Sequence, residues 1–270
     1  MERRDSPRPW IKVFLFLESV VLPLAFLYFA GAIVWGFLKP LDPPRFGKDT
    51  LLGASGVLLD FFFHPEKAPE GVSRIQIYSW VGFGLIRPAI AFLFDILCAA
   101  LIILRTTNVR YVPSSAREIF VPIAGTFLLL LLPLSQFLPG RLGQPMSYPP
   151  DLVITMTALP AVLAVCGGAL AVYGILYLRR NFSIFVEVRE IVLSGPYRYI
   201  RHPLYTGEIA LITGVVLIRP TVFGLFLVAL EIVFQYMRAK MEEARLAESS
   251  PEYAARMLKT GMFFPRLIRR

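Results

Sequence analysis

The chain is nearly devoid of the residues that usually bind transition metals. It contains only two cysteines and two histidines among 270 residues. A zinc or iron site normally needs several such ligands at short spacing, and the sequence holds no cluster of this kind. Cys98 and Cys166 both lie inside apolar segments, where cysteine behaves as a small hydrophobic residue. We therefore expect no metal site.

The chain is also poor in charge and rich in long apolar segments. Charged residues make up 17% of the sequence and hydrophobic residues 56%. A water-soluble domain carries about 25% charged residues, so the low value argues against that class. About 20 consecutive apolar residues are enough for a helix to cross a bilayer. The sequence therefore predicts an all-α fold, a polytopic transmembrane helical bundle in an integral membrane protein.

Six apolar segments are predicted to cross the membrane. They comprise about residues 10–38, 77–104, 119–138, 152–178, 204–218 and 221–237. Residues 51–63 are also apolar but reach only about half the length of a span. We expect them to re-enter the membrane or to lie on its surface. Arg219-Pro220 separates the last two segments and predicts a tight helical hairpin.

Basic residues indicate how these spans are oriented. The formal net charge is +9, and Arg and Lys gather at the N-terminus, in residues 105–118 and 179–201, and in the tail. The positive-inside rule places these segments, with both termini, in the cytoplasm. Residues 39–76 depart from the rule because they place five basic residues on the other side. Since the charge follows the ends of apolar segments, it indicates contact with membrane lipids, and no nucleic-acid partner is expected.

We divide the sequence into two predicted regions at residue 150. Residues 1–150 hold about three spans and carry no motif to which we assign a role. Residues 151–270 are predicted to form a catalytic core with a terminal helical hairpin and a cytosolic tail. In the tail, Ser249 and Glu252 have the spacing of a capping box that starts a short second helix. Gly261 is expected to end that helix.

The run from Ser194 to Glu208, at the entry to the fifth span, contains the densest functional pattern. Gly195-Pro196 predicts a turn, and Pro203 suits the first turn of a helix that begins near His202. Free N–H groups at a helix start favour an anionic ligand group. Three tyrosines offer flat faces for a purine or a sulfonium cation: Tyr197, Tyr199 and Tyr205. A juxtamembrane loop anchored at the headgroups would explain the Tyr and Arg residues but not the Gly and Pro positions.

A polar stripe follows the last predicted span. Glu231, Gln235, Arg238 and Glu242 are spaced by four, three and four residues, which places them within an arc of roughly 60° on a helix. Such a stripe in a membrane helix should face other protein or a wet cavity. Glu243 lies one step off the stripe. Pairing of Arg238 with Glu242 within the helix is the simpler alternative, but it leaves Glu231 and Gln235 without partners.

These motifs resemble those of the isoprenylcysteine carboxyl methyltransferase family. The resemblance rests on Arg180-Asn181-Phe182-Ser183, on the run from Gly195 to Gly207 with its Arg201-His202-Pro203-Leu204-Tyr205 core, on Arg238 with Glu242-Glu243, and on Tyr253 with Phe264-Pro265. It covers about residues 170–267. Phospholipid-amine methyltransferases are similar over the same C-terminal core.

The resemblance implies a methyltransferase that takes S-adenosylmethionine as methyl donor and reaches a lipophilic acceptor sideways from the bilayer. The predicted acceptor is the carboxylate of an isoprenylcysteine or a similar lipid-like molecule. Arg201 is expected to hold the site together, and Arg238 to bind the acceptor's carboxylate or to organise the pocket. These two are the predicted catalytic residues, and Glu231 and Gln235 are predicted to lie on the acceptor side. The implied cofactor-binding residues are Gly195, Tyr197, His202, Pro203, Tyr205, Gly207, Glu242 and Glu243.

The chemistry of the donor agrees with this division of roles. Carboxylates suit the amine or the ribose hydroxyls of S-adenosylmethionine, while His and helix N–H groups suit its carboxylate. A carboxylate acceptor is already ionised, so positioning and exclusion of water can supply most of the rate. An amine or thiol acceptor would need proton removal, for which Glu208 or Glu231 would be the first candidates.

Two other classes of protein remain as alternatives. Membrane sterol reductases are similar at a related Arg-His-Pro segment and bind NADPH. Here Leu204 stands where those proteins have Asn, and Gly195-Pro196-Tyr197 replaces an aromatic Trp pattern, so both departures favour the methyltransferase. A non-enzymatic transporter or scaffold is disfavoured because no internal repeat is visible and the functional-looking residues gather at one end.

Overall fold

The computed structural model describes residues 20–38, 64, 66, 87–104, 115–146, 148–149, 152–185 and 191–266. Within these residues the protein is helical, and the one β-type contact is an isolated parallel bridge between Ile200 and Gly261. The all-α prediction is therefore confirmed for the part described. The predicted re-entrant segment at residues 51–63 lies outside the described residues.

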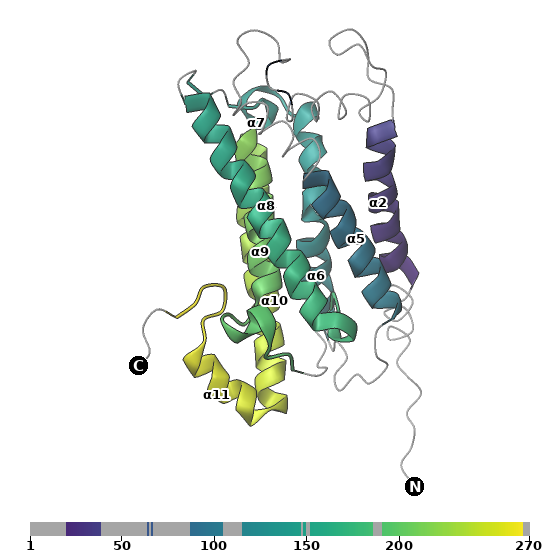
Figure 1. The fold of residues 1–270 in the computed structure, drawn as a ribbon, viewed down its shortest axis with the longest axis vertical. Coiled ribbons are helices and arrows are strands. Elements are labelled where there is room, and N and C mark those ends of the chain that lie inside the picture. Colours follow the sequence, from purple (N-terminus) through teal and green to yellow (C-terminus); the bar gives the residue numbers. More distant parts are fainter. Residues whose placement is uncertain are drawn as a thin grey trace.

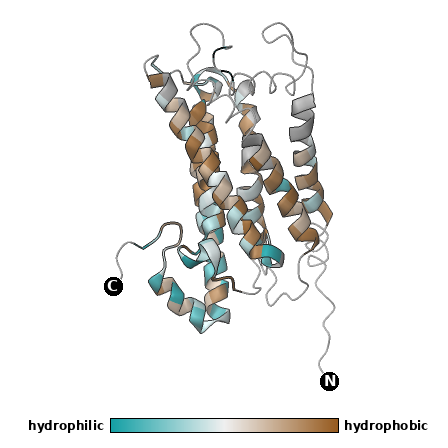
Figure 2. Cartoon of the chain, viewed as in Figure 1, coloured by the Kyte–Doolittle hydropathy of each residue, from teal (hydrophilic) through white to brown (hydrophobic). Residues whose placement is uncertain are grey.

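The main helices run side by side along the long axis of the molecule (Figure 1). They are α2 (Leu22–Leu38), α5 (Arg87–Ile103), α6 (Ala116–Phe127), α8 (Val153–Leu178), α9 (Pro203–Ile218) and α10 (Val222–Ser249). Shorter elements connect or cap them: the 3-10 helices η4 (Leu128–Phe137), η6 (Arg179–Asn181) and η7 (Gly195–Arg198), and the helices α7 (Gly140–Gly143) and α11 (Pro251–Lys259). Hydrophilic residues gather on α11 and the adjoining end of α10 (Figure 2).

Two of the described helices are long and apolar enough to cross a membrane by length and composition. They are Ala158–Leu178 and Val222–Ser249, while Phe92–Ile103 and Pro203–Ile218 are shorter apolar helices. The third predicted span is a 12-residue α-helix followed by a ten-residue 3-10 stretch. That stretch includes Pro133, which has no N–H to donate to the preceding turn. Each predicted span overlaps a helix, but the number of six crossings stays a prediction.

Close packing of α8 against α9 positions the entry to the fifth apolar segment. A Cβ added at Gly207 would lie 2.5 Å from the backbone nitrogen of Ala171, and one at Gly214 would lie 2.4 Å from the carbonyl oxygen of Pro160. Glycine at these contacts lets two helix backbones approach closely, as is common among membrane helices. The start of α9 is thereby fixed beside the C-terminal end of α8.

A hydrophobic core lies beneath the polar end of the bundle. Phe182, Ile184 and Phe185 are each at most 3% exposed and anchor the segment that follows α8. They belong to one cluster with residues of α2, α5, α8 and α9. Because these side chains are buried, the short segment 181–185 has a fixed position relative to the helices.

The cap of α11 differs from the predicted one by one residue. Ser249 is the last residue of α10, and its hydroxyl donates to the carbonyl of Leu246 over 2.9 Å. Ser250 adopts the extended N-cap conformation, and its side chain accepts from the N–H of Tyr253. The prediction that Ser249 caps α11 was therefore wrong, because α10 continues through Ser249 and the cap falls on Ser250. The helix ends at Lys259, just before Gly261.

Candidate functional site

The turn before α9 forms as its Gly and Pro positions predict. Gly195 has φ +59°, and a Cβ there would lie 2.4 Å from the ring of Tyr177. A short 3-10 helix follows it, and α9 begins at Pro203 with His202 in the N-cap position. The predicted turn and helix start are both confirmed.

The tail beyond α11 is joined to this turn mainly through its backbone. The N–H groups of Arg201 and His202 donate to the carbonyls of Gly261 and Met262, each over 3.0 Å. The Thr206 hydroxyl donates to the carbonyl of Phe263 over 3.1 Å. These bonds hold residues 261–263 against the start of α9.

A buried ion pair joins the same turn to α10. Arg201 Nε lies 2.6 Å from Glu243 Oε1, and His202 Nε2 lies 3.2 Å from the same oxygen. Glu243 is 1% exposed. The Arg201 guanidinium also donates to the carbonyls of Met257 and Thr260 in and after α11. Arg201 thus connects the turn before α9 to α10 and to the tail. Its predicted catalytic role stays a prediction.

A second polar group forms one residue away, around Glu242. The Tyr205 hydroxyl donates to Glu242 Oε1, and Arg238 Nε lies 3.3 Å from that oxygen. The Arg238 guanidinium carbon sits 4.6 Å from the centre of the Tyr205 ring, and Nη2 donates to the carbonyl of Ser183 over 3.1 Å. The His202 ring stacks on the Tyr205 ring, with centroids 5.3 Å apart and planes 9° apart.

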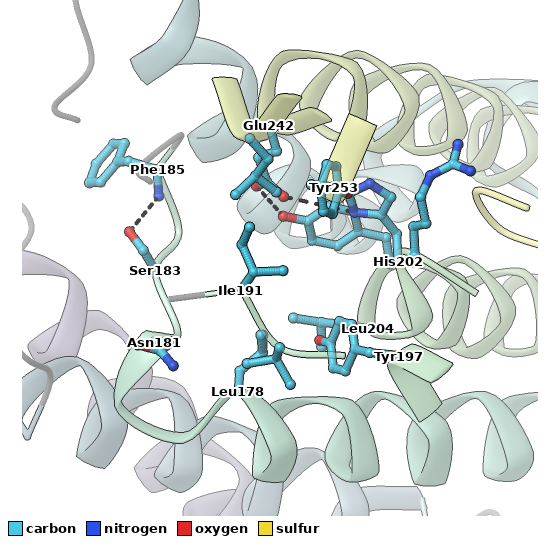
Figure 3. A pocket seen from close by; sticks show the side chains of 14 residues that line it. Leu178, Asn181, Ser183, Phe185, Ile191, Tyr197, His202, Leu204, Glu242 and Tyr253 are labelled. Carbon is cyan, nitrogen blue, oxygen red and sulfur yellow. Dashed lines mark hydrogen bonds and ion pairs between the residues drawn. The ribbon is translucent and has the colours of Figure 1, made fainter. Parts of the chain in front are cut away.

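These groups border a cavity at the polar end of the bundle (Figure 3). Five predicted site residues line it: Tyr197, Arg201, His202, Tyr205 and Glu242. The remaining lining comes from Leu178, Asn181, Ser183, Phe185, Ile191, Val192, Leu204, Leu246 and Tyr253. The wall therefore combines an imidazole, a carboxylate and phenol rings with apolar side chains.

Several other predicted site residues do not line the cavity. Gly195 and Pro203 shape the backbone on either side of the turn, and Gly207 lies at the contact with α8. Glu243 faces Arg201 and His202, and Arg238 lies beneath Tyr205 and Glu242. They support the lining side chains.

Tyr197 and Tyr253 bring phenol groups to the cavity. Burial raises the pKa of Tyr197 well above its usual value, and burial raises the pKa of Tyr253 as well. Both therefore remain protonated near neutral pH and can donate a hydrogen bond. Within the described residues, the Tyr197 hydroxyl is buried and has no hydrogen-bond partner.

The remaining part of the polar stripe forms a separate cluster deeper in the bundle. Gln235 Nε2 donates to Glu231 Oε1 over 2.7 Å and to Glu208 Oε2 on α9 over 2.9 Å. Glu231 and Gln235 are each 1% exposed, and neither lines the cavity. The stripe thus lies on one buried face of α10, as its spacing predicts. A substrate-binding role for Glu231 and Gln235 stays a prediction.

Some lining residues were not predicted as site residues. Asn181, Ser183 and Tyr253 belong to the motifs that carry the family resemblance, so their positions were signalled without a role. Ile191 and Val192 are ordinary apolar residues in the sequence. Their place in the wall depends on how the segment before Gly195 crosses the end of α8.

Two comparisons with known proteins cover this part of the chain. The family model for phospholipid methyltransferase matches residues 155–250. The cobalt-zinc-cadmium resistance protein CzcN of Cupriavidus metallidurans is 30% identical over 116 residues, which make up 42% of this chain and 52% of that protein. The chain thus spans about half the length of this curated relative. The match to the phospholipid methyltransferase family, which is related to the isoprenylcysteine carboxyl methyltransferases, confirms the resemblance predicted from the motifs for this C-terminal part.

Proposed function

We propose that the protein is an integral membrane methyltransferase that binds S-adenosylmethionine in the cavity beside α9 and α10 and methylates a lipophilic acceptor. The family match supports a membrane methyltransferase in general. The observation that carries the finer proposal is the cavity itself. It is lined by the motif residues Tyr197, His202 and Tyr205 together with Glu242 of the last long helix.

The lining residues fit the chemical groups of S-adenosylmethionine. The Glu242 carboxylate suits an ammonium group or a pair of ribose hydroxyls, and the His202 imidazole suits a carboxylate. The buried Tyr197 hydroxyl has no partner among the described residues, so it can donate to a ligand at no cost to an existing bond. When bound, this cofactor supplies a methyl group on a positively charged sulfur.

The chain's own residues orient and shield the reacting groups. Tyr205 and Arg238 fix the Glu242 carboxylate from two directions, which leaves little freedom for the groups that it binds. Leu178, Leu204 and Phe185 form apolar parts of the wall and exclude water. Such positioning accelerates a transfer between two bound molecules without any covalent step on the protein.

The proposed acceptor is an ionised carboxylate on an isoprenylcysteine or a similar lipid-like molecule. Methyl transfer to a carboxylate oxygen would form a carbon–oxygen bond as the methyl–sulfur bond of the donor breaks, leaving a neutral thioether. No proton is released, so no base is needed. A lipid amine would lose a proton instead, and a carboxylate would then have to accept it. Glu242 lines the cavity, whereas Glu208 and Glu231 lie together on Gln235 away from it. We assign Arg238 to pocket organisation, because Glu242, Tyr205 and the Ser183 carbonyl already engage its guanidinium.

Transfer of a labelled methyl group tests the proposal. Protein reconstituted in nanodiscs would be incubated with radiolabelled S-adenosylmethionine and a total lipid and protein extract. We expect label in an apolar, base-labile product, as a methyl ester would be. The Glu242→Gln variant should lose about tenfold or more of this activity, since a hydrogen bond to a charged group contributes about 1.5–3 kcal/mol.

Glu252→Gln is the matched control, because Glu252 is an exposed carboxylate on α11 that does not line the cavity. This variant should transfer label at the wild-type rate. Wild-type protein that transfers no label to any fraction would refute the proposal. Base-stable label in an amine-containing lipid would refute the carboxylate acceptor while retaining the methyltransferase.

A further inference from the structure

A second hollow adjoins the cavity at the C-terminal end of α8. Asn181, Ile191 and Val192 line both spaces, so the two share a wall. The rest of this groove is formed by Leu101 of α5, by Tyr173, Leu176, Tyr177 and Arg179 at the end of α8, and by Leu193 and Ser194. Its lining is largely aliphatic and aromatic, with one cation.

Arg179 differs in its contacts from the three arginines that are ion-paired near the site. Arg201, Arg238 and Arg245 each have a carboxylate within 4 Å. The side chain of Arg179 is exposed, and among the described residues no carboxylate lies within 4 Å of it. Its backbone has φ 50° and ψ −127°, a left-handed conformation that no other non-glycine residue among those described adopts. This conformation turns the chain out of α8 and into the segment that separates the groove from the cavity.

The aromatic and aliphatic residues of the groove have surfaces exposed to the surroundings of the bundle. Tyr173 is 45% exposed, Leu176 48% and Tyr177 37%. In a membrane helix such residues contact lipid chains, and tyrosine suits the boundary between the chains and the headgroups. The groove therefore combines a surface for a hydrocarbon chain with a guanidinium for an anionic group.

We propose that this groove binds the methyl acceptor, with its hydrocarbon chain along Leu101 and Leu176 and its anionic group at Arg179. The inference rests on the proposed function and adds the place and the charge of the substrate. Two observations favour this occupant. Arg179, which has no carboxylate partner among the described residues, complements an anionic amphiphile, and the wall that the groove shares with the cavity brings its head next to the donor site. Arg238 cannot serve in the same way while Glu242 and Ser183 hold it.

Two probes that differ by one charge test this inference. N-acetyl-S-farnesylcysteine carries a carboxylate, and its methyl ester is neutral with the same chain. Binding of each would be measured on the full-length protein in phosphatidylcholine nanodiscs. We expect the wild type to bind the acid about fivefold more tightly than the ester, the upper range for an exposed ion pair. Arg179→Gln should abolish that preference, and Arg179→Lys should retain part of it.

Matched variants separate the groove from general effects. Arg219→Gln removes an exposed arginine between α9 and α10, far along the chain from the site, and should keep the preference for the acid. Leu176→Trp should weaken both probes by filling the groove. Leu225→Trp, at an exposed leucine of α10, should weaken neither.

Binding of S-adenosylmethionine, measured on each variant, distinguishes the two levels of the proposal. A wild type that does not bind this donor would refute the proposed function. If the wild type binds S-adenosylmethionine but Arg179→Gln still binds the farnesylcysteine acid more tightly than its ester, only the groove assignment is overturned. The groove assignment is also overturned if Arg179→Gln loses only co-purifying phosphatidylglycerol and leaves both probes unaffected, because the groove would then hold a bystander lipid.

Discussion

Glu242 and Glu243 are adjacent on α10 and both lie within 4 Å of His202, but Glu243 pairs with Arg201 and Glu242 with Arg238. Replacing each with glutamine should therefore separate ligand binding from stability. Glu243 is 1% exposed and accepts from Arg201 and His202. Breaking a buried ion pair by removing one partner costs about 3–5 kcal/mol. Arg201 would keep two carbonyl acceptors at Met257 and Thr260, so we expect a loss near the lower end for Glu243→Gln, about 3 kcal/mol.

The same substitution at Glu242 should have the opposite profile. The Glu242 side chain is 18% exposed and faces the cavity. Its loss leaves Arg238 with the Ser183 carbonyl and the Tyr205 ring, so we expect about 1 kcal/mol of destabilisation. Affinity for S-adenosylmethionine should instead fall by about tenfold or more.

Two measurements on the same nanodisc samples distinguish these outcomes. Thermal or denaturant unfolding reports stability, and limited proteolysis of residues 251–266 reports whether the tail stays docked on the turn before α9. Glu243→Gln should expose the tail to protease, whereas Glu242→Gln should not. Equal stability of both variants would refute the assignment of Glu243 as the structural member of the pair.

Three further substitutions test other parts of the structure. Gly207→Leu should destabilise the protein by about 3 kcal/mol or more in unfolding assays, because a Cβ there meets the α8 backbone at 2.5 Å. Gly31→Leu is the control and should be tolerated, because a Cβ at Gly31 meets nothing within 4 Å. Tyr197→Phe removes a buried hydroxyl that has no partner among the described residues. It should therefore weaken binding of S-adenosylmethionine in calorimetry and leave stability unchanged or slightly increased. Tyr199→Phe, at a residue that is 66% exposed, should change neither quantity. Ser250→Ala should cost about 1 kcal/mol through loss of the α11 cap, and an equal loss from Ser249→Ala would contradict the observed cap.

Local sequence signals predicted the parts of the site that depend on backbone chemistry. Gly195-Pro196 and His202-Pro203 mark a turn and a helix start, and both form where predicted. The spacing of Glu231, Gln235 and Arg238 predicted a shared face, and all three are buried on α10. These features follow from φ restriction and helical periodicity, which operate within a few residues of the chain.

Long-range contacts explain what the sequence could not predict. The tail is joined to Arg201 and His202 through carbonyls of Gly261 and Met262, and backbone groups leave no side-chain signature. Whether Glu242 or Glu243 faces the cavity depends on the rotation of α10 against α9, which spacing within one helix does not determine. The groove beside Arg179 arises from the approach of α5 to α8, two elements far apart in the sequence.

Titration of purified wild-type protein in nanodiscs with S-adenosylmethionine, followed by calorimetry, tests the central claim most directly. The account predicts saturable binding of one molecule per chain, weakened about tenfold or more by Glu242→Gln and unaffected by Glu252→Gln. Saturable binding of NADPH with no heat from S-adenosylmethionine would contradict it and would favour a reductase.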